Sequence, residues 1–107
     1  MNPEDFPEEF NFEGFEGFDW DSGNRGKSWK KHGVLDRECE EIFYNAPLII
    51  PDVHHSSREE PRFIAKGETD ESRPLIVVFT WRGNLIRPIS ARPMNPREAK
   101  EFTQDEE

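Results

Sequence analysis

The sequence predicts an α+β domain with two short helices first, an antiparallel β-sheet next and one helix at the end of the chain. Two observations support this order. In residues 18–45 apolar side chains recur at helical spacing, whereas residues 48–92 contain short apolar runs that are rich in β-branched residues. A chain of 107 residues is long enough for one small domain with a modest core.

The first predicted elements are a short strand and a helix. The strand covers residues 18–21, where aromatic residues alternate with aspartates. Either Asp21 or Ser22 can cap the helix that follows. This helix continues to about Lys31 and stops at Gly33, because glycine accepts the left-handed conformation of a helix end.

A second short helix is predicted next, with Asp36 as its N-cap. Cys39, Ile42 and Phe43 recur at spacings of three and four residues and form one apolar face. Cys39 is the only cysteine of the chain, so no internal disulfide can form, and its place on that face favours packing over reactivity. The run Asn45-Ala46-Pro47 ends the helix.

Four strands are predicted in the second half of the chain. They cover residues 48–52, 62–68, 75–82 and 85–92. Residues 75–79 are apolar at consecutive positions, as expected for a central strand that is covered on both faces. Gly83-Asn84 suits a type II′ hairpin, and an antiparallel meander is the simplest arrangement. Because Pro88 lacks an amide hydrogen, its strand is expected to lie at an edge or to be interrupted there.

The end of the chain predicts a last helix and the domain boundary. Residues 97–104 can form a helix that packs Ala99 and Phe102 inward. A single domain is therefore expected over residues 18–104, followed by an acidic tail at residues 105–107.

Charge is distributed unevenly along the chain. The net charge is −9, but residues 1–17 carry six acidic residues and no lysine or arginine, and the last three residues are acidic too. The domain between them holds equal numbers of acidic and basic residues, so a local basic face is allowed. Residues 1–17 are expected to form a poorly ordered extension. One hypothesis is that its acids and phenylalanines imitate a phosphate chain and restrain a basic face; the alternative is a solubilising tail.

A series of short motifs occurs in a fixed order along the domain. They are Phe18-Asp19-Trp20-Asp21, Lys31-His32-Gly33-Val34, Asp52-x-x-His55-Ser56, Arg62-Phe63, Gly67-x-Thr69, Arg73-x-Leu75, Val78-Phe79-Thr80-Trp81-Arg82, Arg87-Pro88-Ile89-Ser90-Ala91-Arg92 and Arg97-Glu98. Each motif is short, but the ordered set is specific. It resembles the BrnT family of bacterial type II toxins, which are small endoribonucleases with a RelE-like fold. A subgroup of that family has Tyr-Met-His where this chain has Pro93-Met94-Asn95, which removes two proton-transfer groups.

The resemblance implies a ribonuclease toxin that inhibits translation by cleaving RNA and needs no metal or organic cofactor. It also implies a partner antitoxin of the ribbon-helix-helix type, and contact with operator DNA only through that antitoxin. The acidic balance and the missing Tyr and His leave a second hypothesis open, in which the protein is a catalytically silent binding partner or co-repressor. No apolar run is long enough to span a membrane, and a cytoplasmic location is expected.

Cleavage of an RNA phosphodiester needs cations for the charge on the phosphorane, a base for the 2′-hydroxyl and an acid for the leaving 5′-oxygen. Arginine suits the first role. The arginines within the motifs are Arg62, Arg82, Arg87 and Arg92. Since Arg87 and Arg92 are five positions apart, a regular strand would place them on opposite faces, and an irregularity at Pro88 would bring them together.

Three histidines compete for the proton-transfer role, and of these His32 and His55, but not His54, belong to the motifs of the family. His32 and Glu98 are the predicted catalytic residues among the proton-transfer groups. His32 can alternatively close the first helix by bonding its last carbonyls, and Glu98 can be a structural charge at a helix start. The candidates for RNA binding are Lys27, Lys31, His55 and Trp81. Core packing is the alternative for Trp81. No cluster at ligand spacing accompanies His54-His55, so no metal site is predicted.

Overall fold

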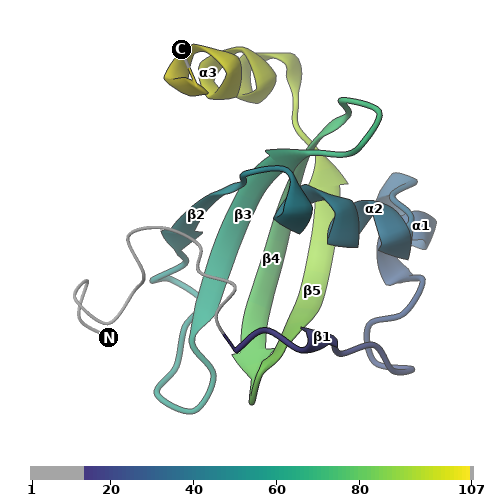
Figure 1. Ribbon diagram of the computed structural model, residues 1–107, viewed down its shortest axis with the longest axis vertical. Helices are drawn as coiled ribbons and strands as arrows, with labels where there is room; N and C mark the ends of the chain where they lie inside the picture. Colours follow the sequence, from purple (N-terminus) through teal and green to yellow (C-terminus); the bar gives the residue numbers. More distant parts are fainter. Residues whose placement is uncertain (1–13, 107) are drawn as a thin grey trace.

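The computed structural model describes residues 14–106 and confirms an α+β fold (Figure 1). Its elements are, in chain order, β1 (Gly17–Phe18), α1 (Lys27–His32), α2 (Asp36–Glu41), the 3₁₀ turn η2 (Ile42–Tyr44), β2 (Leu48–Pro51), β3 (Arg62–Glu68), β4 (Pro74–Arg82), β5 (Leu85–Pro93) and α3 (Pro96–Glu106). The strands form one sheet in the order β1-β5-β4-β3-β2. β2 to β5 make the predicted antiparallel meander, and β4 holds the central position that its apolar run predicts.

β1 contradicts the prediction of a wholly antiparallel sheet. It has two residues and runs parallel to β5, with Gly17 opposite Leu85 and Phe18 opposite Ile86. A parallel pair needs a long connection, and here α1, α2 and three strands lie between the two partners in the chain. The sheet is therefore mixed, and the predicted strand over residues 18–21 ends at Phe18.

The first helix begins later than predicted, at Lys27. Neither Asp21 nor Ser22 caps it, because the polar side chains in this segment hold a turn instead. The Asp21 carboxylate accepts the Gly23 N–H at 2.7 Å. The side-chain oxygen of Asn24 accepts the Asp21 N–H at 2.9 Å.

The junction between α1 and α2 is built on Gly33 and Asp36. Gly33 ends α1, as predicted, with a φ of 66°. Asp36 is the first residue of α2 rather than its predicted N-cap. That position is held by Leu35, whose N–H donates to the Glu38 carboxylate at 2.9 Å. The Asp36 oxygens instead accept the Gly26 N–H at 3.1 Å, which ties the start of α2 to the start of α1.

β5 is interrupted at Pro88, as the missing amide hydrogen predicts. Phe79 pairs with Pro88, whereas the neighbouring Val78 pairs with Ser90. Ile89 is therefore an extra residue in β5 and forms a β-bulge. In the hairpin before it, Gly83 has the positive φ of 61° expected for its turn.

The outer edge of β5 is covered by two different segments. β1 pairs with its first two residues, and the segment around the start of α1 covers the part beyond the bulge. The Asn24 side-chain amide donates to the Pro88 carbonyl at 2.8 Å, and the Ala91 N–H donates to Ser28 Oγ at 2.9 Å. Both side chains are buried, and they satisfy backbone groups that an uncovered edge strand would expose.

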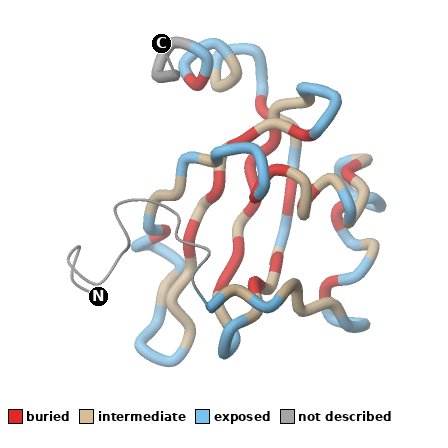
Figure 2. The backbone as a smooth tube through the Cα atoms, in the orientation of Figure 1, coloured by how far each residue is buried: buried red, intermediate tan, exposed pale blue. Residues whose placement is uncertain are grey.

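Buried residues recur along β3, β4 and β5 (Figure 2). They form two separate groups, one on each face of the sheet. The larger group lies between the sheet and the segment 34–43, and it consists of Val34, Cys39, Ile42, Phe43, Phe63, Ala65, Leu75, Val77, Phe79, Ile86 and Ala91. The smaller group contains Ile76, Met94 and Phe102, against which Ile64 and Ala99 pack. Ala99 and Phe102 thus point inward, as predicted. Cys39 is buried as predicted, and this burial raises the pKa of its thiol to about 12.

Both ends of the domain extend beyond the expected boundaries. The sequence assigns residues 14–17 to the extension, but these residues join the domain, and Phe15 packs against the larger core. At the other end, α3 continues to Glu106. Residues 1–13, on which the hypothesis of a phosphate mimic mainly rests, lie outside the described part of the chain.

Candidate functional site

α2 and η2 cover one face of the sheet, α1 lies beside the outer edge of β5, and α3 packs on the other face at one end (Figure 1). In β3, Phe63 and Ala65 are buried beneath the helices, so Arg62 and Lys66 belong to the opposite face. We call this opposite surface the open face. Residues that pair directly across antiparallel strands share a face. The basic residues of the open face are therefore Arg62, Lys66, Arg82, Arg87 and Arg92.

The bulge in β5 places Arg87 and Arg92 on the same face. Arg87 stands opposite Thr80 and Arg92 stands opposite Ile76. These two partners are four positions apart on β4, so their side chains point the same way. The sequence leaves a regular and an irregular strand open, and the bulge selects the arrangement in which both arginines share a face.

Two rows of residues cross the open face. The hairpin-end row consists of Arg62, Thr80 and Arg87, one from each of β3, β4 and β5. The α3-end row consists of Lys66, Ile76 and Arg92. Since the rows are four residues apart along β4, they are separated by roughly 13 Å at about 3.3 Å per residue.

Arg87 is held firmly by two carboxylates of the segment after β1. It lies 3.0 Å from Asp21 and 3.5 Å from Asp19, and 11% of its side chain is exposed. The hydrogen bonds from Arg87 are the main cause that lowers the pKa of Asp21, and the same bonds raise the pKa of Arg87. The sequence gives no simple signal for this pairing, because the partners are more than sixty positions apart.

Arg92 is paired with Glu98 at the start of α3. Two nitrogens of Arg92 donate to the two carboxylate oxygens of Glu98 at 2.7 and 2.8 Å. Glu98 also accepts the Asn95 N–H at 3.0 Å, while the Asn95 side chain accepts the Glu98 N–H at 2.8 Å. This reciprocal pair is a capping box. The Arg92 hydrogen bonds and the Asn95 N–H together lower the pKa of Glu98 to about 2. Of the two roles expected for Glu98, this geometry favours the structural one at the start of a helix over the catalytic one.

Arg62 and Arg82 are held more loosely. Arg82 is 52% exposed and lies 3.8 Å from Glu60, which belongs to the loop between β2 and β3. The Arg62 guanidinium has no ion pair within residues 14–106. The hairpin end therefore presents two arginines that a bound anion can approach.

The loop from Asp52 to Arg62 is closed by the hydroxyl of Ser56. Ser56 Oγ donates to the Asp52 carbonyl at 2.7 Å and accepts the Arg62 N–H at 2.8 Å. The Asp52 N–H donates to the Arg62 carbonyl at 2.9 Å, so Asp52 stands beside the hairpin-end row. These bonds give the Asp52-x-x-His55-Ser56 motif a structural explanation.

His55 is bound to the carboxylate of Asp52. Its Nδ1 lies 3.0 Å from both carboxylate oxygens. The Asp52 side chain is 8% exposed, whereas the His55 side chain is 69% exposed. His55 is a predicted RNA-binding residue, whereas the sequence assigns Asp52 no role beyond its place in the same motif; the spacing of the two within that motif could have indicated the pair.

The other candidates lie away from the open face. Lys27, Lys31 and His32 are exposed on α1, which packs beside β5 on the helix-covered side. At the end of α1, the Gly33 N–H donates to the Trp29 carbonyl at 3.0 Å, and within residues 14–106 the His32 side chain makes no hydrogen bond to a carbonyl of the helix. Trp81 packs against the larger core, so it lies on the opposite face from its neighbour Arg82.

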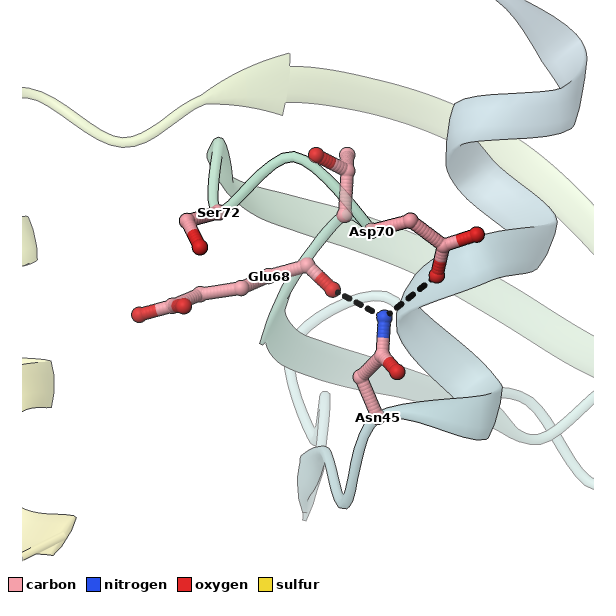
Figure 3. A pocket seen from close by; sticks show the side chains of 5 residues that line it. Asn45, Glu68, Asp70 and Ser72 are labelled. Carbon is pink, nitrogen blue, oxygen red and sulfur yellow. Dashed lines mark hydrogen bonds between the residues drawn. The ribbon is translucent and has the colours of Figure 1, made fainter.

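A pocket of about 480 Å³ lies at the end of β3 near the β3–β4 loop (Figure 3). It is lined by Asn45, Glu68, Thr69, Asp70 and Ser72. The Asn45 amide donates to the Glu68 carbonyl and to the Asp70 carboxylate, both at 3.0 Å. Its acidic lining does not suit a phosphate, and it lies at the opposite end of β3 from Arg62.

Two general features of the described residues bear on the kind of site. No group of three or more His, Cys, Asp and Glu side chains is arranged to hold a metal ion within residues 14–106. No helix in the same range has the length and apolar character of a membrane span.

The chain matches a family model described as the ribonuclease toxin BrnT of a type II toxin–antitoxin system. The match covers residues 20–98, a range that includes all of the predicted site residues. No curated protein matches the chain. The open face, the motifs that build it and the family match lead to one conclusion: this chain belongs to the BrnT family of ribonuclease toxins of type II toxin–antitoxin systems.

Proposed function

We propose that the protein cleaves RNA without a metal ion and that the hairpin end of the open face binds the scissile phosphate. The observation that carries this proposal is the gathering of five basic residues on one side of a sheet in a chain with a net charge of −9. Phosphates are bound chiefly by arginine and lysine side chains, so this is the surface that suits RNA.

The roles of the arginines follow from how they are held. Arg62 and Arg82 contact the phosphate and stabilise the charge of the phosphorane, because neither is locked to a close carboxylate. Arg87 holds the segment after β1 in place through its ion pairs with Asp19 and Asp21, and it adds positive charge to the hairpin-end row. Arg92 contacts a flanking phosphate when its pair with Glu98 opens, and in this scheme Glu98 controls Arg92 rather than taking part in proton transfer.

The basic residues of α1 lie away from the hairpin-end row and are proposed to bind RNA outside the cleavage site. Lys27, Lys31 and His32 contact RNA that runs past the edge of β5, and His32 does not reach the scissile phosphate. Trp81 supports Arg82 from the opposite face through its packing against the core.

The proposal also includes the fold, the antitoxin partner and the cellular location that family membership implies. The fold is RelE-like, and a ribbon-helix-helix antitoxin neutralises the toxin and carries the complex to operator DNA. Toxin, antitoxin and RNA would meet in the cytoplasm.

The test is incubation of the purified, antitoxin-free chain with labelled total RNA in the presence of EDTA. We expect cleavage by the wild type and at least about a 100-fold slower cleavage by Arg82→Ala. The matched control is Arg37→Ala, which removes an exposed arginine from α2 on the helix-covered side and should cleave like the wild type.

A catalytically silent partner is the second candidate function. The observation that favours it is the pairing of Arg87 and Arg92 with carboxylates, which leaves fewer free cations on the open face. Absence of cleavage by a folded wild type, together with tight antitoxin binding, would support this candidate and contradict the first.

A further inference from the structure

We propose that His55 is the general base of the cleavage reaction and that Asp52 positions it. The inference rests on the proposed ribonuclease function and names the proton-transfer residue of that site. It begins from the contact of His55 Nδ1 with both Asp52 oxygens at 3.0 Å.

The Asp52 carboxylate determines which nitrogen of His55 can act as a base. An ionised carboxylate only accepts hydrogen bonds, so the Nδ1 atom beside it carries the hydrogen of the neutral imidazole. The lone pair is then on Nε2. Nε2 has no hydrogen-bond partner within residues 14–106, and the ring is 69% exposed, so a substrate can reach this atom.

The environment of Asp52 makes the pair well suited to positioning. Its side chain is 8% exposed and therefore confined, and both of its oxygens lie 3.0 Å from Nδ1 of the imidazole. A carboxylate held in this way orients the ring and stabilises the imidazolium that forms when Nε2 takes a proton.

The same loop brings the base to the cations. The Asp52 N–H binds the Arg62 carbonyl at 2.9 Å, and Ser56 Oγ bonds to the backbone of both residues. Glu60 of this loop lies 3.8 Å from Arg82. The base and the two loosely held arginines therefore belong to the same end of the sheet, whereas His32 lies on α1 beside β5.

The proton balance of the step is simple. Nε2 of neutral His55 takes the proton of the 2′-hydroxyl, and the 2′-oxygen forms a bond to phosphorus. The bond from phosphorus to the 5′-oxygen breaks, and that oxygen takes a proton from a water molecule. The imidazolium of His55 then gives its proton to the hydroxide that remains, which restores the neutral base. The products are a 2′,3′-cyclic phosphate and a 5′-hydroxyl end.

The first experiment compares His55→Ala with His54→Ala, its exposed neighbour, which has no hydrogen-bond partner within the described residues. We expect His55→Ala to lower kcat on a labelled oligonucleotide by about 10²- to 10⁴-fold with little change in RNA affinity. His54→Ala should cleave like the wild type. Added imidazole should restore part of the activity of His55→Ala, which a purely structural role would not allow.

The second experiment tests the positioning role of Asp52. Asp52→Asn should lower kcat and leave KM unchanged, because an amide can donate to Nδ1 and so favour the wrong tautomer. Thermal unfolding of Asp52→Asn is compared with that of the wild type to show that the variant folds. If it does not fold, the kcat of His55→Ala decides whether the proposal holds.

The outcomes separate this proposal from the proposed function. If the wild type does not cleave RNA, the ribonuclease function itself fails. If the wild type cleaves and Arg82→Ala does not, but His55→Ala retains full kcat, the function stands and His55 is not the base. Loss of RNA affinity with unchanged kcat in His55→Ala would make it a binding residue and would also overturn the proposal.

Discussion

The two ends of the open face carry similar charges and hold them differently. At the α3 end, Arg92 forms a two-point ion pair with Glu98, which is itself part of the capping box of α3. At the hairpin end, Arg87 is held by Asp21 and Asp19, whereas Arg82 has one contact at 3.8 Å and Arg62 has no ion pair within residues 14–106. The number of basic residues on a surface therefore does not show how many of them can bind a phosphate, because some are already paired with carboxylates.

The difference arises from what stands beside each arginine. Two residues separate the end of β5 from the start of α3, whose first N–H groups need hydrogen-bond acceptors. Glu98, the third residue of the helix, serves both the cap and Arg92. At the hairpin end, the Asp52–Arg62 loop is closed by backbone groups and the Ser56 hydroxyl, so the guanidinium of Arg62 is not needed to hold it.

The largest expected effect compares one arginine from each end. Arg62→Ala should slow RNA cleavage by about 10²- to 10³-fold, as expected for loss of a charge-stabilising donor. Arg92→Ala should have a smaller effect because its guanidinium is already paired with Glu98. Initial rates on one labelled RNA would measure both, and equal losses would show that the two ends are not functionally different.

The next effect concerns the attachment of α3. Phe102 is 5% exposed and lies in the smaller core, so Phe102→Ala should lower the free energy of unfolding by about 3 kcal/mol. Urea denaturation measures this change. Below the denaturation midpoint, cleavage should be retained because the hairpin end does not contact this cluster. A fully folded variant that has lost cleavage would mean that α3 supports the hairpin end as well.

A smaller effect is expected from the cap of α3. Asn95→Ala removes the side chain that accepts the Glu98 N–H and should cost about 1 kcal/mol of stability. The control is Arg97→Ala in the same helix turn, whose side chain is 88% exposed and whose loss should cost less than about 0.5 kcal/mol. A larger loss in Arg97→Ala than in Asn95→Ala would contradict the importance of the capping box.

The smallest effect is a pH dependence at the α3 end. The pKa of Glu98 falls from 4.5 to about 2 in the folded protein, so the unfolded chain binds its proton more readily. The stabilisation is complete above pH 4.5 and is lost as the pH falls toward 2. Glu98→Gln should therefore flatten the stability profile in that window, as thermal unfolding at several pH values would show. An unchanged profile would mean that the pair contributes nothing.

The sequence predicts the regular parts of this fold and fails at contacts between distant residues. The four strands of the meander, the central β4 and the glycine at the end of α1 follow from local pattern. The late start of α1 does not, because Asp21 and Asn24 bind the backbone of their own turn in competition with a helix. The parallel pairing of β1 also depends on the whole path of the chain between β1 and β5.

By itself, the sequence determined the family, the residue types of the site and the interruption of β5 at Pro88. These follow from motif order and from the missing amide hydrogen of one proline. Only the tertiary structure decided that Arg87 and Arg92 share a face. It also decided two pairings: Glu98 forms an ion pair with Arg92, and the Asp52 carboxylate contacts His55. Sharing a face depends on the register of a neighbouring strand, and pairing depends on distances in space, and neither quantity is contained in the spacing of residues along the chain.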